Sequence, residues 1–243
     1  MRADATTLPG RDRGPGADHA RAGAGWALVT DGCSSVPLAD VGARLISSAV
    51  AAQLDGGGPP DLPAAAATAA AAARLLGLPP ACLAATALVA WIDGDHACAE
   101  LWGDGELWFG APGAPAARVA VAADGEAPAY PALDPAPWLA AGGRARRIGD
   151  DPACAQISGP DGAGPLRARW PLGAAGWLLL ASDGLRQVGG HSPAAAAAAL
   201  TAWGPGGGAF VSRRARRWAR ALQADGHALG DDLGLAALRW GAP

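Results

Sequence analysis

Two apolar runs of strand length each end in an aspartate followed by a glycine, and this repeated ending limits how the chain can fold. The runs are WALVTDG at residues 26–32 and GWLLLASDG at residues 176–184. An uninterrupted apolar run of this length indicates a buried strand. A carboxylate at the end of such a strand loses part of its hydration, which costs several kcal/mol unless a cation compensates. The sequence therefore predicts that buried strands deliver Asp31 and Asp183 to a divalent metal.

A third candidate lies near the C-terminus, where GDDLGLAALRW places Asp231 and Asp232 directly before an apolar strand. Asp-Gly by itself carries little information, since it occurs eight times here and is an ordinary turn signal. Asp93, for example, lies in a DGDH connection between two predicted strands, where a turn is favoured. If the three strand ends meet, an all-oxygen ligand set favours Mg²⁺ or Mn²⁺ over Zn²⁺.

The remaining pattern predicts an α+β fold. Residues 82–92, 96–102 and 106–109 form consecutive strands with short turns, which indicates an antiparallel meander. Helical spacing or alanine-rich composition predicts helices at 40–54, 64–76, 193–203 and 209–223. Two mainly antiparallel sheets flanked by helices, a four-layer α-β-β-α sandwich, bury these faces best. We expect one domain over residues 1–243, with a flexible arm at 1–12 and an irregular, flap-like region at 110–165.

Composition excludes several classes of function. The net charge is −3 and all nineteen basic residues are arginine, so Schiff-base and Walker-type lysines are absent. The four cysteines lack CxxC spacing, which argues against a structural zinc site. No signal peptide or membrane-spanning run is recognisable, so a cytoplasmic protein without a membrane partner is expected. The arginine-rich helix at 209–223 could bind nucleic acid or membrane, but packing on the sandwich is favoured, and no nucleic-acid partner is expected.

A set of short motifs, taken in order, resembles the metal-dependent protein phosphatases of type 2C, the PPM family, and its divergent bacterial members in particular. The resemblance covers residues 10–240 and implies a β-sandwich between helical layers. It rests on the order and spacing of DHA (18–20), VTDGCSS (29–35), ATALVAW (85–91), LWGDGEL (101–107), LLLASDGL (178–185) and GDDLGLAAL (230–238).

The resemblance implies two, or with a third site three, Mg²⁺ or Mn²⁺ ions. Asp31 would bridge two of them, Gly32 would offer its backbone carbonyl, and Asp183 and Asp231 would complete the ligands. Asp18 would hold a metal-bound water, and Asp104 would bind the third ion. Arg13 lies at the spacing of a phosphate-binding arginine found in some members.

The implied activity is hydrolysis of phosphoserine and phosphothreonine in proteins by a hydroxide shared between two ions, with Asp31, Asp183 and Asp231 as the catalytic set. This sequence departs from the family pattern around that set. DGCSS replaces DGxGG, Ala17 replaces a glutamate, Asp232 stands where asparagine is usual, and Gly234 replaces a threonine or serine. The general acid is unassigned. The alternative is a PPM-fold protein with impaired catalysis that regulates or binds a phosphoprotein.

Overall fold

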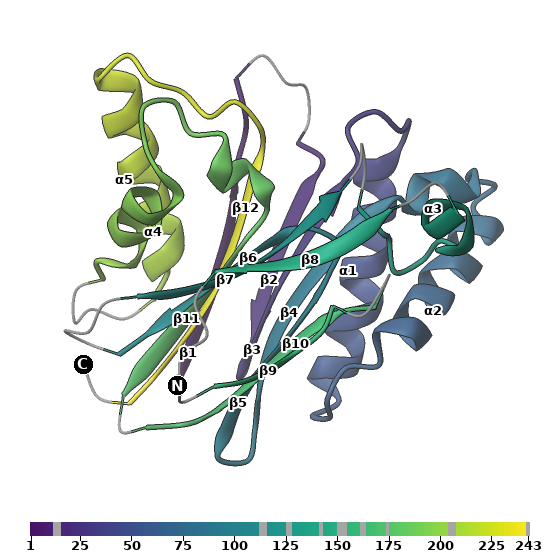
Figure 1. Cartoon of the computed structure of the whole chain (residues 1–243), viewed down its shortest axis with the longest axis horizontal. Helices are drawn as coiled ribbons and strands as arrows, with labels where there is room; N and C mark the ends of the chain where they lie inside the picture. Colours follow the sequence, from purple (N-terminus) through teal and green to yellow (C-terminus); the bar gives the residue numbers. More distant parts are fainter. Residues whose placement is uncertain are drawn as a thin grey trace.

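The structure is a computed structural model that describes residues 1–11, 16–111, 116–124, 128–140, 143–149, 155–160, 164–173, 175–203 and 208–241. Figure 1 shows four layers, with helices α4 and α5 on one side, two sheets in the middle, and helices α1 and α2 on the other side. The predicted α+β sandwich is confirmed. No helix within these ranges is both long and apolar enough to cross a bilayer.

Within the described residues both sheets have six strands, and every neighbouring pair is antiparallel. The first sheet has the order β1 (Arg2–Leu8), β12 (Leu233–Trp240), β11 (Gly176–Ala181), β6 (Gly105–Gly110), β7 (Ala117–Asp124), β8 (Arg144–Gly149). The second has the order β2 (Asp18–Gly23), β3 (Trp26–Gly32), β4 (Ala85–Asp93), β5 (His96–Trp102), β10 (Leu166–Pro171), β9 (Gln156–Ser158).

Helices cover the outer face of each sheet. The second sheet carries α1 (Ala39–Asp55) and α2 (Leu62–Leu75), and the first carries α4 (Pro193–Thr201) and α5 (Phe210–Ala224). Helix α5 buries Val211, Ala215, Trp218 and Leu222, which agrees with the packing interpretation of this arginine-rich segment. Short elements complete the fold: α3 (Ala136–Ala140) and the 3₁₀ helices η1 (Pro80–Leu83) and η2 (Asp183–Arg186).

The central strands are apolar throughout because both of their faces are buried. In β3, Ala27 and Val29 point between the sheets, whereas Trp26 and Leu28 pack under helix α1. Side chains alternate along a strand, so Asp31 shares the face of Ala27 and Val29. The chain thus carries a carboxylate to the rim of the layer between the two sheets.

Two expectations about irregular regions are corrected. Residues 1–12 were expected to be a flexible arm, but Arg2–Leu8 form β1 and pair with β12 along their whole length. The region 110–165 was expected to be irregular, but its described part contains the helix α3 and three strands: β7 and β8 extend the first sheet, and β9 forms an edge of the second. The edge strands β8 and β9 show no apolar alternation, because most of their side chains are exposed.

Gly42 marks the closest packing of helix α1. A Cβ atom at this position would lie 1.8 Å from the carbonyl oxygen of Cys82 in η1. We expect Gly42→Ala to lower the free energy of unfolding by about 1–3 kcal/mol, because overpacking outweighs the gain of about 1 kcal/mol in helix propensity. Urea unfolding measures the change. Gly58→Ala is the control, since nothing lies within 4 Å of the added atom, and an equal loss there would contradict the packing argument.

Candidate metal centre

Six aspartates from separate parts of the chain line one cavity of about 180 Å³ at the rim of the sandwich. We call it the acidic cavity. All the aspartates proposed as metal ligands from the sequence line this cavity. Asp93, which was assigned to a turn, ends β4 in the hairpin with β5 and does not line it. The six are Asp18, Asp31, Asp104, Asp183, Asp231 and Asp232.

Strand pairing brings Asp18 and Asp31 together. The two residues are directly opposite each other in the β2–β3 ladder, and Thr86 of β4 is opposite Asp31 on its other side. Side chains at such positions have Cβ atoms about 4.5–5.5 Å apart, and like charges there are destabilising. The Asp18 and Asp31 carboxyls are also hydrogen-bonded to each other.

The other aspartates come from connections next to these strands. Asp104 lies in the turn that carries the chain from β5 in one sheet to β6 in the other. This turn requires its flanking glycines, because Gly103 and Gly105 have φ values of 85° and 149°. Asp183 opens η2 after β11, and Asp231 precedes β12.

Crowding of carboxyl groups shifts their pKa values upward. Burial raises the pKa of Asp31 well above its usual range, and the charges of Asp18, Asp183 and Asp104 raise it further. Burial likewise raises the pKa of Asp18 and of Asp104, each to about 6. The pKa of Asp183 is raised by burial and by the charge of Asp231. Such a cluster of buried negative charge is stabilised by a bound cation.

The residues present suit a hard divalent cation. Carboxylate oxygens are the ligands that Mg²⁺ and Mn²⁺ prefer. The hydroxyl of Thr86 is buried in the same cavity without a hydrogen-bond partner, as expected of a group that faces a ligand or a bound water. However, no three His, Cys, Asp or Glu side chains in the described parts of the chain converge closely enough to hold an ion as they stand. Cation binding would therefore require the carboxyls to draw together.

Ser182 and Gly234 hold Asp18 in place. The Ser182 hydroxyl donates to Asp18 Oδ2 at 2.6 Å, and the Gly234 amide donates to the same oxygen at 2.6 Å. The absence of a side chain at Gly234 has a steric reason, because a Cβ atom there would lie 2.7 Å from Cγ1 of Val29. This departure from the family pattern is therefore matched by the packing around it.

Asp232, which stands where the family has asparagine, fastens the segment after β1. Its Oδ1 accepts the Gly10 amide at 2.8 Å, and its Oδ2 accepts the Ala17 amide at 2.9 Å. Both ends of the 10–17 connection are thus tied to the residue beside Asp231. Arg13, the expected phosphate-binding arginine, lies outside the described residues.

Removal of the Asp232 carboxylate should loosen this connection. We expect Asp232→Ala to lower the free energy of unfolding by about 2–4 kcal/mol, because two backbone amides lose the buried carboxylate that accepts their hydrogen bonds. Urea unfolding without added metal measures the loss. Asp225→Ala, at an exposed aspartate after α5, is the matched control. Equal stability of the two variants would rule out a clamping role for Asp232.

A buried glutamate ties the neighbourhood of Asp104 to that of Asp183. Glu106 is fully buried and accepts a hydrogen bond from Nε of Arg186 at 2.9 Å. Arg118 and Trp108 also donate hydrogen bonds to its carboxylate. Arg186 belongs to η2 and further binds the carbonyl oxygens of Gly105 and Val121. Although burial raises the pKa of Glu106, hydrogen bonds from both arginines lower it more, so the pKa lies below its usual value. The glutamate is therefore held as a carboxylate.

Sequence reasoning missed several residues around the cavity. Tyr130 lines the cavity and is hydrogen-bonded to Cys33, and its pKa is raised first by burial and then by that contact. Nothing in the sequence signals Tyr130, whereas Ser182 could have been found inside the ASDG motif. His191 does not line the cavity, since its ring packs edge-on against His227.

No protein-family model matches the sequence, and no curated protein does. Solved structures match along nearly the whole chain. The serine/threonine phosphatase PstP/Ppp of Mycobacterium tuberculosis is 20% identical with a TM-score of 0.61, and covers 100% of this chain and 99% of its own.

A PstP catalytic domain in complex with two manganese ions is 19% identical with a TM-score of 0.60, and covers 98% and 97% of the two chains. A bacterial serine phosphatase is 12% identical with a TM-score of 0.61, and covers 100% and 99%. At these identities the likeness shows a shared fold. The fold expected from the resemblance to PPM phosphatases is thereby confirmed.

Proposed function

We propose that this chain is a divergent PPM-type phosphatase that hydrolyses phosphate monoesters with the help of divalent cations. The observation that carries the proposal is the convergence of six aspartates, from both sheets and their connections, on one small cavity. Like charges at this density favour a cation as their counter-charge. The match to a fold that holds two manganese ions in PstP supports the same conclusion.

We assign the ligands as follows. Asp31 would be a ligand of two ions and the backbone carbonyl of Gly32 a ligand of one of them, and Asp183 and Asp231 would complete the set. Asp18 would act through a bound water, and Asp104 would serve a third site. When bound, Mg²⁺ or Mn²⁺ ions supply Lewis acidity and lower the pKa of water near the phosphorus.

The protein's own groups would position these elements. Ser182 and Gly234 fix the orientation of Asp18, and this carboxylate would accept a proton from the attacking water. The Thr86 hydroxyl would donate a hydrogen bond to an oxygen atom in the cavity. Glu106 and Arg186 hold η2 and so fix the position of Asp183. A cavity of about 180 Å³ admits a phosphate group and leaves the rest of the substrate outside. That size fits a phosphorylated side chain on a protein, and we propose phosphoserine and phosphothreonine as the substrates.

A metal titration tests the proposal. Purified protein stripped with EDTA should be inactive, and added Mn²⁺ or Mg²⁺ should restore hydrolysis of p-nitrophenyl phosphate and of a phosphothreonine peptide. Ca²⁺, with its looser coordination, serves as the control cation. Hydrolysis at the same rate in EDTA would refute the metal-dependent mechanism.

One observation favours a second function, a regulatory protein that binds phosphoproteins without hydrolysing them. The Asp18 and Asp31 carboxyls bond to each other, and no three ligands converge as they stand among the described residues. Calorimetry with Mn²⁺ separates the two functions. Metal binding without turnover of either substrate would support the regulatory protein, and metal binding with turnover would support the enzyme.

A further inference from the structure

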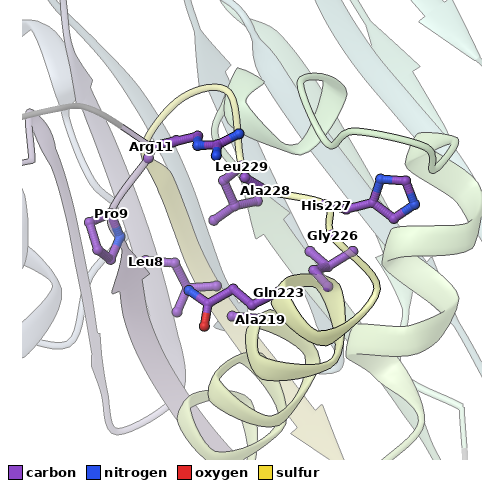
Figure 2. Close-up of a pocket in the computed structure, with 11 residues that line it drawn as sticks. Leu8, Pro9, Arg11, Ala219, Gln223, Gly226, His227, Ala228 and Leu229 are labelled. Carbon is purple, nitrogen blue, oxygen red and sulfur yellow. The ribbon is translucent and has the colours of Figure 1, made fainter.

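A second and larger cavity lies between the end of β1 and the C-terminal half of α5. Its volume is about 480 Å³, and it shares no lining residue with the acidic cavity. We call it the α5 cavity. Figure 2 shows Arg11 and Gln223 on opposite sides of it, while the ring of His227 turns away from Arg11.

The walls of the α5 cavity combine an apolar floor with a cationic rim. Leu8, Leu222 and Leu229 form the floor, and each is buried in the core beneath α5. The polar side chains are Arg11, Gln223 and His227, and no acidic side chain of the described residues lines the cavity. The cavity therefore suits a ligand with an apolar body and a negative group.

The surface leading to the cavity has the same sign of charge. Helix α5 contains five arginines and no acidic residue. Arg216 and Arg220 are exposed and precede Gln223 by seven and three residues, so they lie on the same side of the helix. A row of like charges beside a concave site concentrates anions there, although the whole chain has a net charge of −3.

We propose that the α5 cavity binds a nucleoside monophosphate. Its volume lies in the range of small-ligand sites, which are mostly apolar with a few placed polar groups. The apolar floor would hold the flat base, and the Gln223 amide can pair with the hydrogen-bonding edge of adenine, as glutamine does in nucleic-acid complexes. Arg11 would contact the phosphate, since a guanidinium binds phosphate oxygens in pairs.

Hydrogen bonds connect the α5 cavity to the acidic cavity. The Arg11 amide donates to the Leu229 carbonyl at 2.9 Å, and the Gly10 amide donates to Asp232 at 2.8 Å. Gly230, next to Leu229, donates to the carbonyl of Gln187, whose side chain contacts Asp231. A nucleotide that orders these two segments would also order Asp231 and Asp232. This coupling rests on the proposed function, but binding itself does not.

Calorimetry with AMP in EDTA tests the binding without any contribution from metal. AMP should bind at least about tenfold more tightly than adenosine or inorganic phosphate, because each lacks one half of the recognition. Arg11→Gln should weaken AMP binding about tenfold or more and leave adenosine unchanged. Ala219→Phe, which fills the cavity, should abolish binding of both. The matched control is Arg74→Gln, at an exposed arginine on α2 that should have no effect.

Circular dichroism establishes that each variant is folded, and Gln223→Ala provides a second test that leaves the cavity open. The proposal is overturned if AMP does not bind, if adenosine binds as tightly as AMP, or if Arg11→Gln and Gln223→Ala both bind AMP like the wild type. Because no metal or phosphatase substrate is present, AMP binding can succeed while hydrolysis fails, and the reverse. The two proposals therefore fail separately.

Discussion

Replacement of Asp31 by asparagine should reduce Mn²⁺-dependent hydrolysis of p-nitrophenyl phosphate by about a thousandfold or more. Asp31 is central in the acidic cavity, because its pKa responds to Asp18, Asp104 and Asp183 together. The amide retains the shape of the side chain but removes the charge that two cations would share. Loss of this charge removes both the ligand and the electrostatic stabilisation of the reacting phosphate. Initial rates over a Mn²⁺ titration measure the effect.

The same substitution should not unfold the protein. Metal-free Asp31→Asn should be at least as stable as the wild type, because one of several opposed carboxylates has been removed. The wild type should gain thermal stability when Mn²⁺ is added, and the variant should gain much less. Asp225→Asn should behave like the wild type in both measurements. Full activity of Asp31→Asn would show that the acidic cavity is not the catalytic centre.

Glu106→Ala should lower the free energy of unfolding by about 2–4 kcal/mol, because Arg118 and Arg186, whose side chains are only 24% and 26% exposed, lose the buried carboxylate that compensates their charges. Trp108 would lose its hydrogen-bond acceptor as well. The pKa of Glu106 lies below its ordinary value in the folded protein, so this stabilisation is present at neutral pH and fades as the pH falls through the lowered pKa. Urea unfolding at pH 7 measures the difference.

Glu100 provides a matched control. It belongs to a second Glu-Leu-Trp segment and accepts a hydrogen bond from Nε1 of Trp102, as Glu106 does from Nε1 of Trp108. Its partner Arg167, however, has a side chain that is 61% exposed, against 26% for Arg186. Water can solvate Arg167 after the change, so Glu100→Ala should cost clearly less. Equal losses for the two variants would mean that burial of the arginine partners does not decide the effect.

The sequence predicts the layers well because the central strands are buried on both faces. WALVT and GWLLLA form nearly continuous apolar runs, and such strands need apolar cover on both faces, which the second sheet and the helices provide here. The strand pattern also singles out Asp31, Asp183, Asp231 and Asp232, whereas Asp18 and Asp104 were identified only through the resemblance to PPM phosphatases. Their proximity could not be read from spacing, because it depends on the register that sets Asp18 opposite Asp31.

Other features required the structure because their partners are distant along the chain. The two Glu-Leu-Trp segments are visible in the sequence, but nothing there shows that Arg186, 80 positions away, forms a hydrogen bond with Glu106. Asp232 is similar, since its acceptor role depends on amides more than 200 residues away. Edge strands such as β1 and β8 were missed because they bury little apolar surface and so show weak periodicity.

The pairing of β1 with β12 also bears on the order of events during synthesis. β12 lies between β1 and β11, so residues 2–8 have no partner in their sheet until residues 233–240 have left the ribosome. Contacts this far apart in sequence form slowly, because a long loop must close first. Asp231 and Asp232 arrive together with β12. A nascent chain would therefore carry an incomplete set of cavity carboxylates until β12 pairs with β1 and β11.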